Sequence, residues 1–164
     1  MVLETERLEL VPLSLERLKL LKDNLNMLEK ELDCVYKGEA LEGFILEYLD
    51  KQIRVISNNS ESCLYNAFWL LIRKSDRIAV GSAAFKGLPN GNGEIEIGYG
   101  LGNEFEHNGY MTEGVCGMCK WGLAQKEVKH IIAETDIHGY ASQRILERNG
   151  FERYRFNDSI WWRL

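Results

Sequence analysis

Two glutamates and two glycines alternate along one predicted strand of this chain. Within residues 93–101 one face carries Ile95, Ile97, Tyr99 and Leu101, and the other carries Glu94, Glu96, Gly98 and Gly100. The second face therefore sets two carboxylates beside two positions without side chains, where a ligand can lie against the backbone. A carboxylate in that place could accept a proton from a reacting group. The alternative is an ordinary strand with solvated glutamates.

The segment that follows, residues 103–113, contains Gly109 and leads into a predicted helix that begins at Tyr110. A helix N-terminus presents unpaired backbone N–H groups and the positive end of the helix dipole, which together favour a phosphate-bearing ligand. A glycine at position 109 lets such a ligand approach the backbone closely. We therefore expect an anion site at this turn, with a plain strand–turn–helix connection as the alternative.

Length and charge limit the class of protein. At 164 residues the chain is long enough to bury a core, and we expect residues 1–164 to form a single domain. The net charge of −5 argues against nucleic-acid and anionic-membrane partners, and weakly favours a cationic or amine substrate. The sequence has neither an apolar run of membrane-spanning length nor a signal-peptide pattern at its start, which favours the cytoplasm.

The cysteines and histidines do not predict a metal site. Cys116 and Cys119 form a C-x-x-C pair, but they lie within an apolar helical pattern and no second ligand pair accompanies them. We expect buried free thiols, no disulfides and no metal.

Apolar periodicity and turn residues divide the chain into strands and helices. We expect strands at 3–12, 68–72, 78–85, 93–101, 130–136, 151–156 and 159–164, and helices at 15–24, 26–32, 40–55, 110–125 and 141–148. Ser14 is placed to cap the first helix, and residues 58–62 form a turn. This order predicts an α+β (mixed α/β) fold, with a central, mostly antiparallel sheet of about seven strands and helices on both faces.

Three segments resemble the GNAT acetyltransferases, and specifically the subgroup that includes the ribosomal-protein-alanine N-acetyltransferases. They are Leu3–Leu8 (LETERL), Glu96–Tyr99 with Asn108–Glu113 (EIGY and NGYMTE), and Ala141–Phe151 (ASQRILERNGF). They occur in the family's order and spacing and span nearly the whole chain. The resemblance implies a GNAT-like fold whose central strand separates from its neighbour in a V-shaped splay.

The resemblance also implies direct transfer of an acetyl group from acetyl-CoA to a primary amine in a ternary complex, without a covalent enzyme intermediate or a metal. The implied contacts are Tyr99, Gly100 and Leu101 for the acyl and pantetheine groups, the backbone of His107, Asn108, Gly109, Tyr110 and Met111 for the pyrophosphate, and the Thr112 hydroxyl beside them. A backbone N–H near residues 99–101 would stabilise the oxyanion.

The same transfer needs a base for the amine and a proton for the leaving thiolate. Glu96 is the first candidate for the base; Glu94 is second, ahead of Glu134 and Asp136. Ser142 falls at the family's position for the proton donor to the thiolate, with capping of its own helix as the alternative role.

Several residues depart from the family's pattern. Glu106 stands at the first position of the pyrophosphate loop, where Arg or Gln is usual, and His107 replaces a frequent Gly. Gly139 replaces a common Asn, and Gly100 a frequent Trp. A carboxylate at about 6 Å would oppose phosphate binding by about 1 kcal/mol.

These departures leave open a larger acyl group, an unusual substrate, or a catalytically silent CoA-binding or regulatory module. The acceptor stays open between a protein N-terminus and a small cationic amine, and the oligomeric state between a monomer and a homodimer. Trp161 and Trp162 are neighbours on the last strand, so we expect one in the core and one at the surface, where it would mark a dimer contact or a substrate wall.

Overall fold

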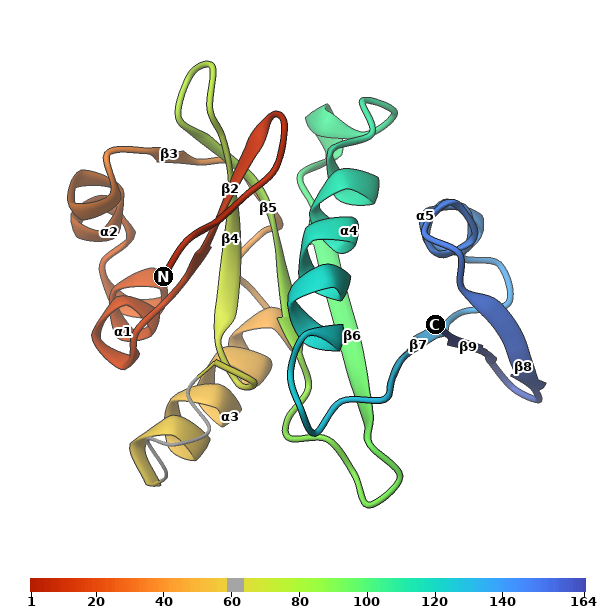
Figure 1. The fold of residues 1–164 in the computed structure, drawn as a ribbon. Coiled ribbons are helices and arrows are strands. Elements are labelled where there is room, and N and C mark those ends of the chain that lie inside the picture. Colours follow the sequence, from red (N-terminus) through yellow and green to blue (C-terminus); the bar gives the residue numbers. More distant parts are fainter. Residues whose placement is uncertain (59–63) are drawn as a thin grey trace.

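The computed structural model describes residues 1–58 and 64–164, and the strands of this described part form one nine-stranded sheet (Figure 1). The strands are β1 (Leu3–Glu4), β2 (Leu8–Pro12), β3 (Val35–Tyr36), β4 (Phe68–Arg73), β5 (Ile78–Phe85), β6 (Glu94–Leu101), β7 (His130–Thr135), β8 (Glu152–Phe156) and β9 (Ile160–Arg163). Their order is β1-β2-β4-β5-β6-β7-β9-β8, with β3 beside β5. Only the β6–β7 and β3–β5 pairs are parallel among these strands.

Helices cover both faces of the sheet (Figure 1). They are α1 (Leu15–Asp23), α2 (Leu25–Leu32), α3 (Phe44–Asn58), α4 (Tyr110–Leu123) and α5 (Tyr140–Arg148), and a short 3₁₀ turn, η2 (Asn103–Phe105), precedes α4. A core cluster that contains Leu18, Leu28 and Leu49 lies on the α1–α3 side, and one that contains Met111 and Leu146 on the α4–α5 side. None of the described helices is long and apolar enough to cross a membrane.

The predicted α+β fold is confirmed, with local differences. The expected strand 3–12 is two strands, because the Thr5 N–H donates to the Leu8 carbonyl and the Thr5 hydroxyl accepts from the Leu8 N–H, which closes a turn between them. The short strand β3 was not predicted, since two residues carry no periodicity, and α3 begins at Phe44 rather than at residue 40. The turn expected at 58–62 falls largely outside the described residues.

Other local predictions are confirmed in full or in part. The Ser14 side chain accepts a hydrogen bond from the Arg17 N–H and so caps α1. Trp162 lies in the core at 1% exposure as predicted, but Trp161 is half-buried beneath the Arg155 guanidinium rather than at the surface. Cys34, Cys116 and Cys119 are free thiols, and Cys63 lies outside the described residues.

The expected splay lies between β6 and β7. Their parallel pairing ends where Glu96 stands opposite Ile132, although β6 continues to Leu101. Residues 97–101 pair only with β5 on their other side. One edge of β6 therefore presents backbone groups without a strand partner over its last five residues.

A cluster of polar contacts ties the N-terminal turn to the first turn of α4. Glu113 accepts hydrogen bonds from the Thr5 hydroxyl (2.6 Å), the Arg7 backbone N–H (2.7 Å) and the Arg7 Nε (2.7 Å). Burial by itself would raise the pKa of Glu113, but these bonds outweigh it and hold the pKa below its ordinary value of 4.5. A carboxylate near a helix N-terminus also interacts favourably with the helix dipole.

We expect Glu113→Gln to lower the free energy of unfolding at pH 7 by about 1–3 kcal/mol, because charge-assisted hydrogen bonds are lost in a partly buried place. A group whose pKa is lower in the folded state stabilises the fold above its unfolded value, and this stabilisation is lost as the pH falls through the folded value. The difference from wild type should therefore shrink below about pH 4.

Urea unfolding at pH 7 and pH 3.5 measures this difference. Glu106→Gln is the matched control, since it removes the same charge from an exposed residue nearby and should change stability by less than about 0.5 kcal/mol. An equal effect of the two substitutions would contradict a specific role of the Glu113 contacts.

Candidate active site

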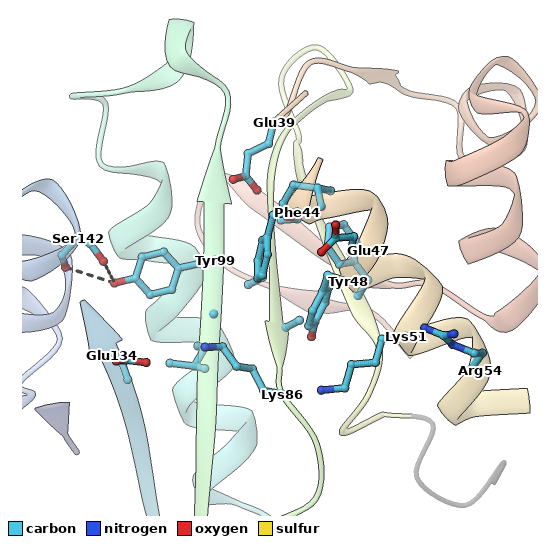
Figure 2. A pocket seen from close by; sticks show the side chains of 18 residues that line it. Glu39, Phe44, Glu47, Tyr48, Lys51, Arg54, Lys86, Tyr99, Glu134 and Ser142 are labelled. Atoms are coloured by element: carbon cyan, nitrogen blue, oxygen red, sulfur yellow. Dashed lines mark hydrogen bonds between the residues drawn. The ribbon is translucent and has the colours of Figure 1, made fainter. Parts of the chain in front are cut away.

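A cavity of about 630 Å³ extends across β6 at the splay (Figure 2). On one side it reaches Ala133 of β7 and Ser142 of α5, and on the other Phe44 and Tyr48 of α3. Its volume lies in the range of cavities that bind small ligands. Because it borders the unpaired edge of β6, a molecule in the cavity can approach a second molecule held along that edge.

A carboxylate that the sequence did not single out lies in this cavity. Glu39, in the loop between β3 and α3, points its carboxyl group toward the end of β6 (Figure 2). A Cβ atom on residue 100 would lie only 1.8 Å from that carboxyl group, so Glu39 fills the space that Gly100 leaves. Burial raises the pKa of Glu39, and a hydrogen bond from Ser82 lowers it by less. The carboxyl group is therefore a stronger base than an exposed glutamate.

The two glutamates predicted on β6 are both ion-paired. Glu96 accepts a hydrogen bond from the Lys86 Nζ and does not line the cavity. Glu94 accepts hydrogen bonds from Arg163 Nη2 (2.6 Å) and Asn90 Nδ2 (3.0 Å). Both glutamates therefore have specific side-chain partners, whereas the alternative interpretation expected solvated carboxylates.

The two less favoured carboxylates lie on or after β7. Glu134 lines the cavity, is exposed, and accepts a hydrogen bond from the Ser159 hydroxyl (2.5 Å). Asp136 is exposed and accepts from the His138 N–H (2.7 Å), outside the cavity lining.

Tyr99 and Ser142 form a hydroxyl pair on the other side of β6 (Figure 2). Their oxygen atoms lie 2.8 Å apart, and the Tyr99 hydroxyl also donates to the Ser142 carbonyl at 3.2 Å. Burial raises the pKa of Tyr99 to about 12, so its phenol stays protonated at neutral pH. Gly139 is the N-cap of α5, which places Ser142 inside the first turn and excludes the capping role considered for it. No sequence pattern predicts the contact between Ser142 and Tyr99.

The turn before α4 has the properties of an anion site. His107 and Gly109 adopt positive φ angles of 63° and 78°. Arg7 Nη1 donates to the Asn108 carbonyl (2.9 Å), and the Asn108 side-chain amide donates to the carbonyls of Phe105 and Glu106. Within the described residues, the backbone N–H groups of residues 107–112 have no hydrogen-bond partner. The loop is thus held through its carbonyl groups, while its N–H groups are free to bind a phosphate.

The departures at residues 106 and 107 have local consequences in this loop. Glu106 is exposed and forms no ion pair with any described residue, so its carboxylate is solvated. His107 occupies a left-handed conformation that costs a side-chain-bearing residue about 1–2 kcal/mol. That cost explains why a glycine would suit this position.

The protein shares its sequence and fold with known acetyltransferases. Residues 7–152 match the family model for the acetyltransferase (GNAT) domain. The chain is 27% identical over 150 residues to the uncharacterized N-acetyltransferase YjdG of Bacillus subtilis (strain 168), a match that covers 92% of this chain and 89% of YjdG.

Two solved structures share the fold over the whole chain. A GNAT-family acetyltransferase from Bacillus anthracis superposes with a TM-score of 0.67 at 18% identity, covering 100% of this chain and 98% of that one. RimL, a ribosomal L7/L12 alpha-N-protein acetyltransferase in complex with coenzyme A, superposes with a TM-score of 0.69 at 13% identity. This match covers 100% of this chain and 97% of RimL. Since the family model spans most of the sequence, this chain belongs to the GNAT acetyltransferases, a family that uses acetyl-CoA.

Proposed function

We propose that this chain is an acetyl-CoA-dependent N-acetyltransferase that acts directly on a primary amine in a ternary complex. The observation that carries the proposal is the unpaired edge of β6 over residues 97–101, which borders the cavity and continues toward the turn before α4. A donor along that edge and an acceptor in the cavity would meet at the splay. Holding both reactants in this way lowers the entropic part of the barrier.

Backbone groups would hold the donor. The free N–H groups of residues 107–112 would bind the pyrophosphate at the positive end of α4, with the Thr112 hydroxyl beside them. Tyr99, Gly100 and Leu101 would contact the pantetheine and acyl groups, and an N–H of this segment would stabilise the oxyanion. When bound, acetyl-CoA supplies the acetyl group as an activated thioester.

The acceptor amine must lose a proton before its nitrogen attacks the thioester carbonyl. Glu96 remains the base that the sequence predicts, and Glu39 is the base that the geometry adds. We favour Glu39, because it lines the cavity and burial raises its pKa. An ammonium group at Glu96 would first have to displace Lys86.

The leaving thiolate needs a proton as the new C–N bond forms and the C–S bond breaks. The Tyr99–Ser142 pair can donate it, since both hydroxyls are protonated at neutral pH and the cavity reaches both residues. Ser142 is the donor suggested by the family resemblance, and Tyr99 would return a proton to it through their 2.8 Å contact.

A protein N-terminus is the acceptor that we favour over a small amine. The cavity is large enough for several residues of an extended chain, and it opens between the sheet and α3. The structural neighbour RimL carries the description of an alpha-N-protein acetyltransferase, which supports the same class of acceptor.

Calorimetric titration of acetyl-CoA tests the donor site first. We expect wild-type binding with a dissociation constant of about 1–100 μM and its loss in Gly109→Glu, where a carboxylate and a side chain would oppose the pyrophosphate. Gly109→Ala is the matched control, because any side chain is strained at a φ of 78° and only Glu adds charge. Gly109→Ala should weaken binding by about tenfold.

The absence of binding to the wild-type protein would overturn the donor site. Binding without turnover on any amine would instead indicate a catalytically silent CoA-binding or regulatory module.

Substitution of the two candidate bases separates them. We expect Glu39→Gln to lower kcat by about 100-fold and to leave acetyl-CoA affinity unchanged, with a smaller loss in Glu96→Gln. The activity of the wild-type protein should rise with pH through the pKa of Glu39. This rise should be absent from the pH–activity profile of Glu39→Gln. Because a raised folded-state pKa means that the charged form destabilises the fold, Glu39→Gln should also raise Tm at pH 7. Full activity of Glu39→Gln and a large loss in Glu96→Gln would make Glu96 the base.

Removal of either hydroxyl tests the proton donor. We expect Ser142→Ala and Tyr99→Phe each to lower kcat by about tenfold, less than the roughly 100-fold of general acid catalysis elsewhere, because a thiolate leaves readily. Tyr140→Phe, an exposed tyrosine two residues before Ser142 on α5, is the control. Wild-type rates in both variants would show that water supplies the proton.

A further inference from the structure

On the α3 side of β6, the acidic and basic groups of the cavity wall lie toward different ends, while Glu134 lines the β7 side (Figure 2). Glu39 lies at one end, beside the last residues of β6. Lys51 and Arg54 of α3 and Lys86 at the end of β5 lie at the other. Lys51 and Arg54 are three residues apart and so share one face of α3.

Lys51 and Arg54 form no direct ion pair within the described residues. Lys86 is paired with Glu96, but neither Lys51 nor Arg54 forms an ion pair with a described residue. Glu47 lies one turn before Lys51 on α3 and lines the cavity, yet the two side chains form no ion pair. Two cations without a direct ion-pair partner among the described residues therefore line the cavity, in a chain whose net charge is −5.

These cations are not placed to bind the phosphates of the donor. Figure 1 shows the N-terminus of α4 at the end of the sheet where β6 finishes, and the C-terminal half of α3 toward the opposite end. The turn with the free N–H groups is at the start of α4. The basic end of the cavity is therefore left for the acceptor.

The span along β6 between Glu39 and Lys86, which marks the basic end, gives an approximate length for the ligand. Glu39 lies over Gly100, and Lys86 is bound to Glu96, four residues earlier on β6. At about 3.3 Å per residue these positions are about 13 Å apart. An α-amino acid is too short, since one carbon separates its amine from its carboxylate. An extended peptide covers this distance in about four residues.

We propose that the acceptor is a peptide or protein N-terminus with acidic side chains near its fourth and fifth residues, whose amine lies at Glu39 and whose carboxylates bind Lys51 and Arg54. This inference rests on the proposed N-acetyltransferase activity and specifies its substrate.

A set of C-terminally amidated hexapeptides tests it. The acidic peptide is Ala-Ala-Ala-Asp-Asp-Ala, and its isosteric and reversed-charge partners carry Asn-Asn or Lys-Lys in place of Asp-Asp. A fourth peptide, Ala-Asp-Asp-Ala-Ala-Ala, moves the acidic pair toward the amine. We expect kcat/KM from thiol release to be about tenfold higher for the acidic peptide than for the Asn peptide. The preference should fall with added salt.

In the Lys51→Gln/Arg54→Gln variant, the ratio of kcat/KM for the acidic peptide to kcat/KM for the Asn peptide should fall to about two. Lys19→Gln/Lys30→Gln removes the same charge from exposed residues of α1 and α2 outside the cavity, and should keep the wild-type ratio. Calorimetric titration of each peptide into protein saturated with CoA gives the same comparison without turnover, with the acidic peptide again bound about tenfold more tightly.

The outcomes separate this inference from the proposed function. Equal rates for the acidic and Asn peptides, or faster acetylation of the Lys peptide or of spermidine, would overturn the acidic acceptor and leave the N-acetyltransferase activity intact. Faster acetylation of free aspartate or of the fourth peptide would overturn the proposed spacing between the amine and the acidic side chains. Tighter binding of the acidic peptide without acetylation of any amine would support the anion site and overturn the proposed activity.

Discussion

The candidate active site depends on the point at which β6 and β7 stop pairing. The two strands pair up to Glu96 and Ile132, where Ile95 and Ile131 are fully buried in the core. Beyond that point each strand keeps a partner on its outer side, β6 with β5 and β7 with β9. Only the inner edges lose hydrogen bonds, and they border the cavity, where water or a ligand can satisfy them. The sheet can therefore open for a donor without losing its core.

The turn before α4 is held by the N-terminal strands, which lie far away in the sequence. Arg7 donates both to the Asn108 carbonyl in the turn and to Glu113 in the first turn of α4. Leu8 directly follows Arg7 and belongs to the same buried cluster as Met111. Packing and charge thus fix the start of α4 against β2, and the N–H groups of the turn stay free because its carbonyls and side chains make the contacts that hold it. Such prior positioning lowers the cost of binding an anion.

Local patterns predicted the features that depend on local sequence. The alternation over residues 94–101 gave the two faces of β6, and the helical stripe over 110–122 gave the buried face of α4. Glu39 could not be found in this way, because its role arises from a contact with Gly100 that only the folded chain creates. The absence of a side chain at position 100 indicated space on that face, but not the residue that fills it. The Lys86–Glu96 pair likewise depends on the register of β5 against β6.

Net charge and local charge give opposite expectations for the acceptor. The value of −5 averages over the whole chain and weakly favours a cation. At physiological ionic strength, however, exposed charges beyond about 8–10 Å are largely screened. A ligand in the cavity is therefore governed by the groups on its wall, where Glu39 is half-buried and Lys51 and Arg54 lack an ion-pair partner among the described residues. Because backbone groups would hold the donor in the proposed mechanism, substitutions on this wall could change the acceptor without altering donor binding, which allows one fold to serve different substrates.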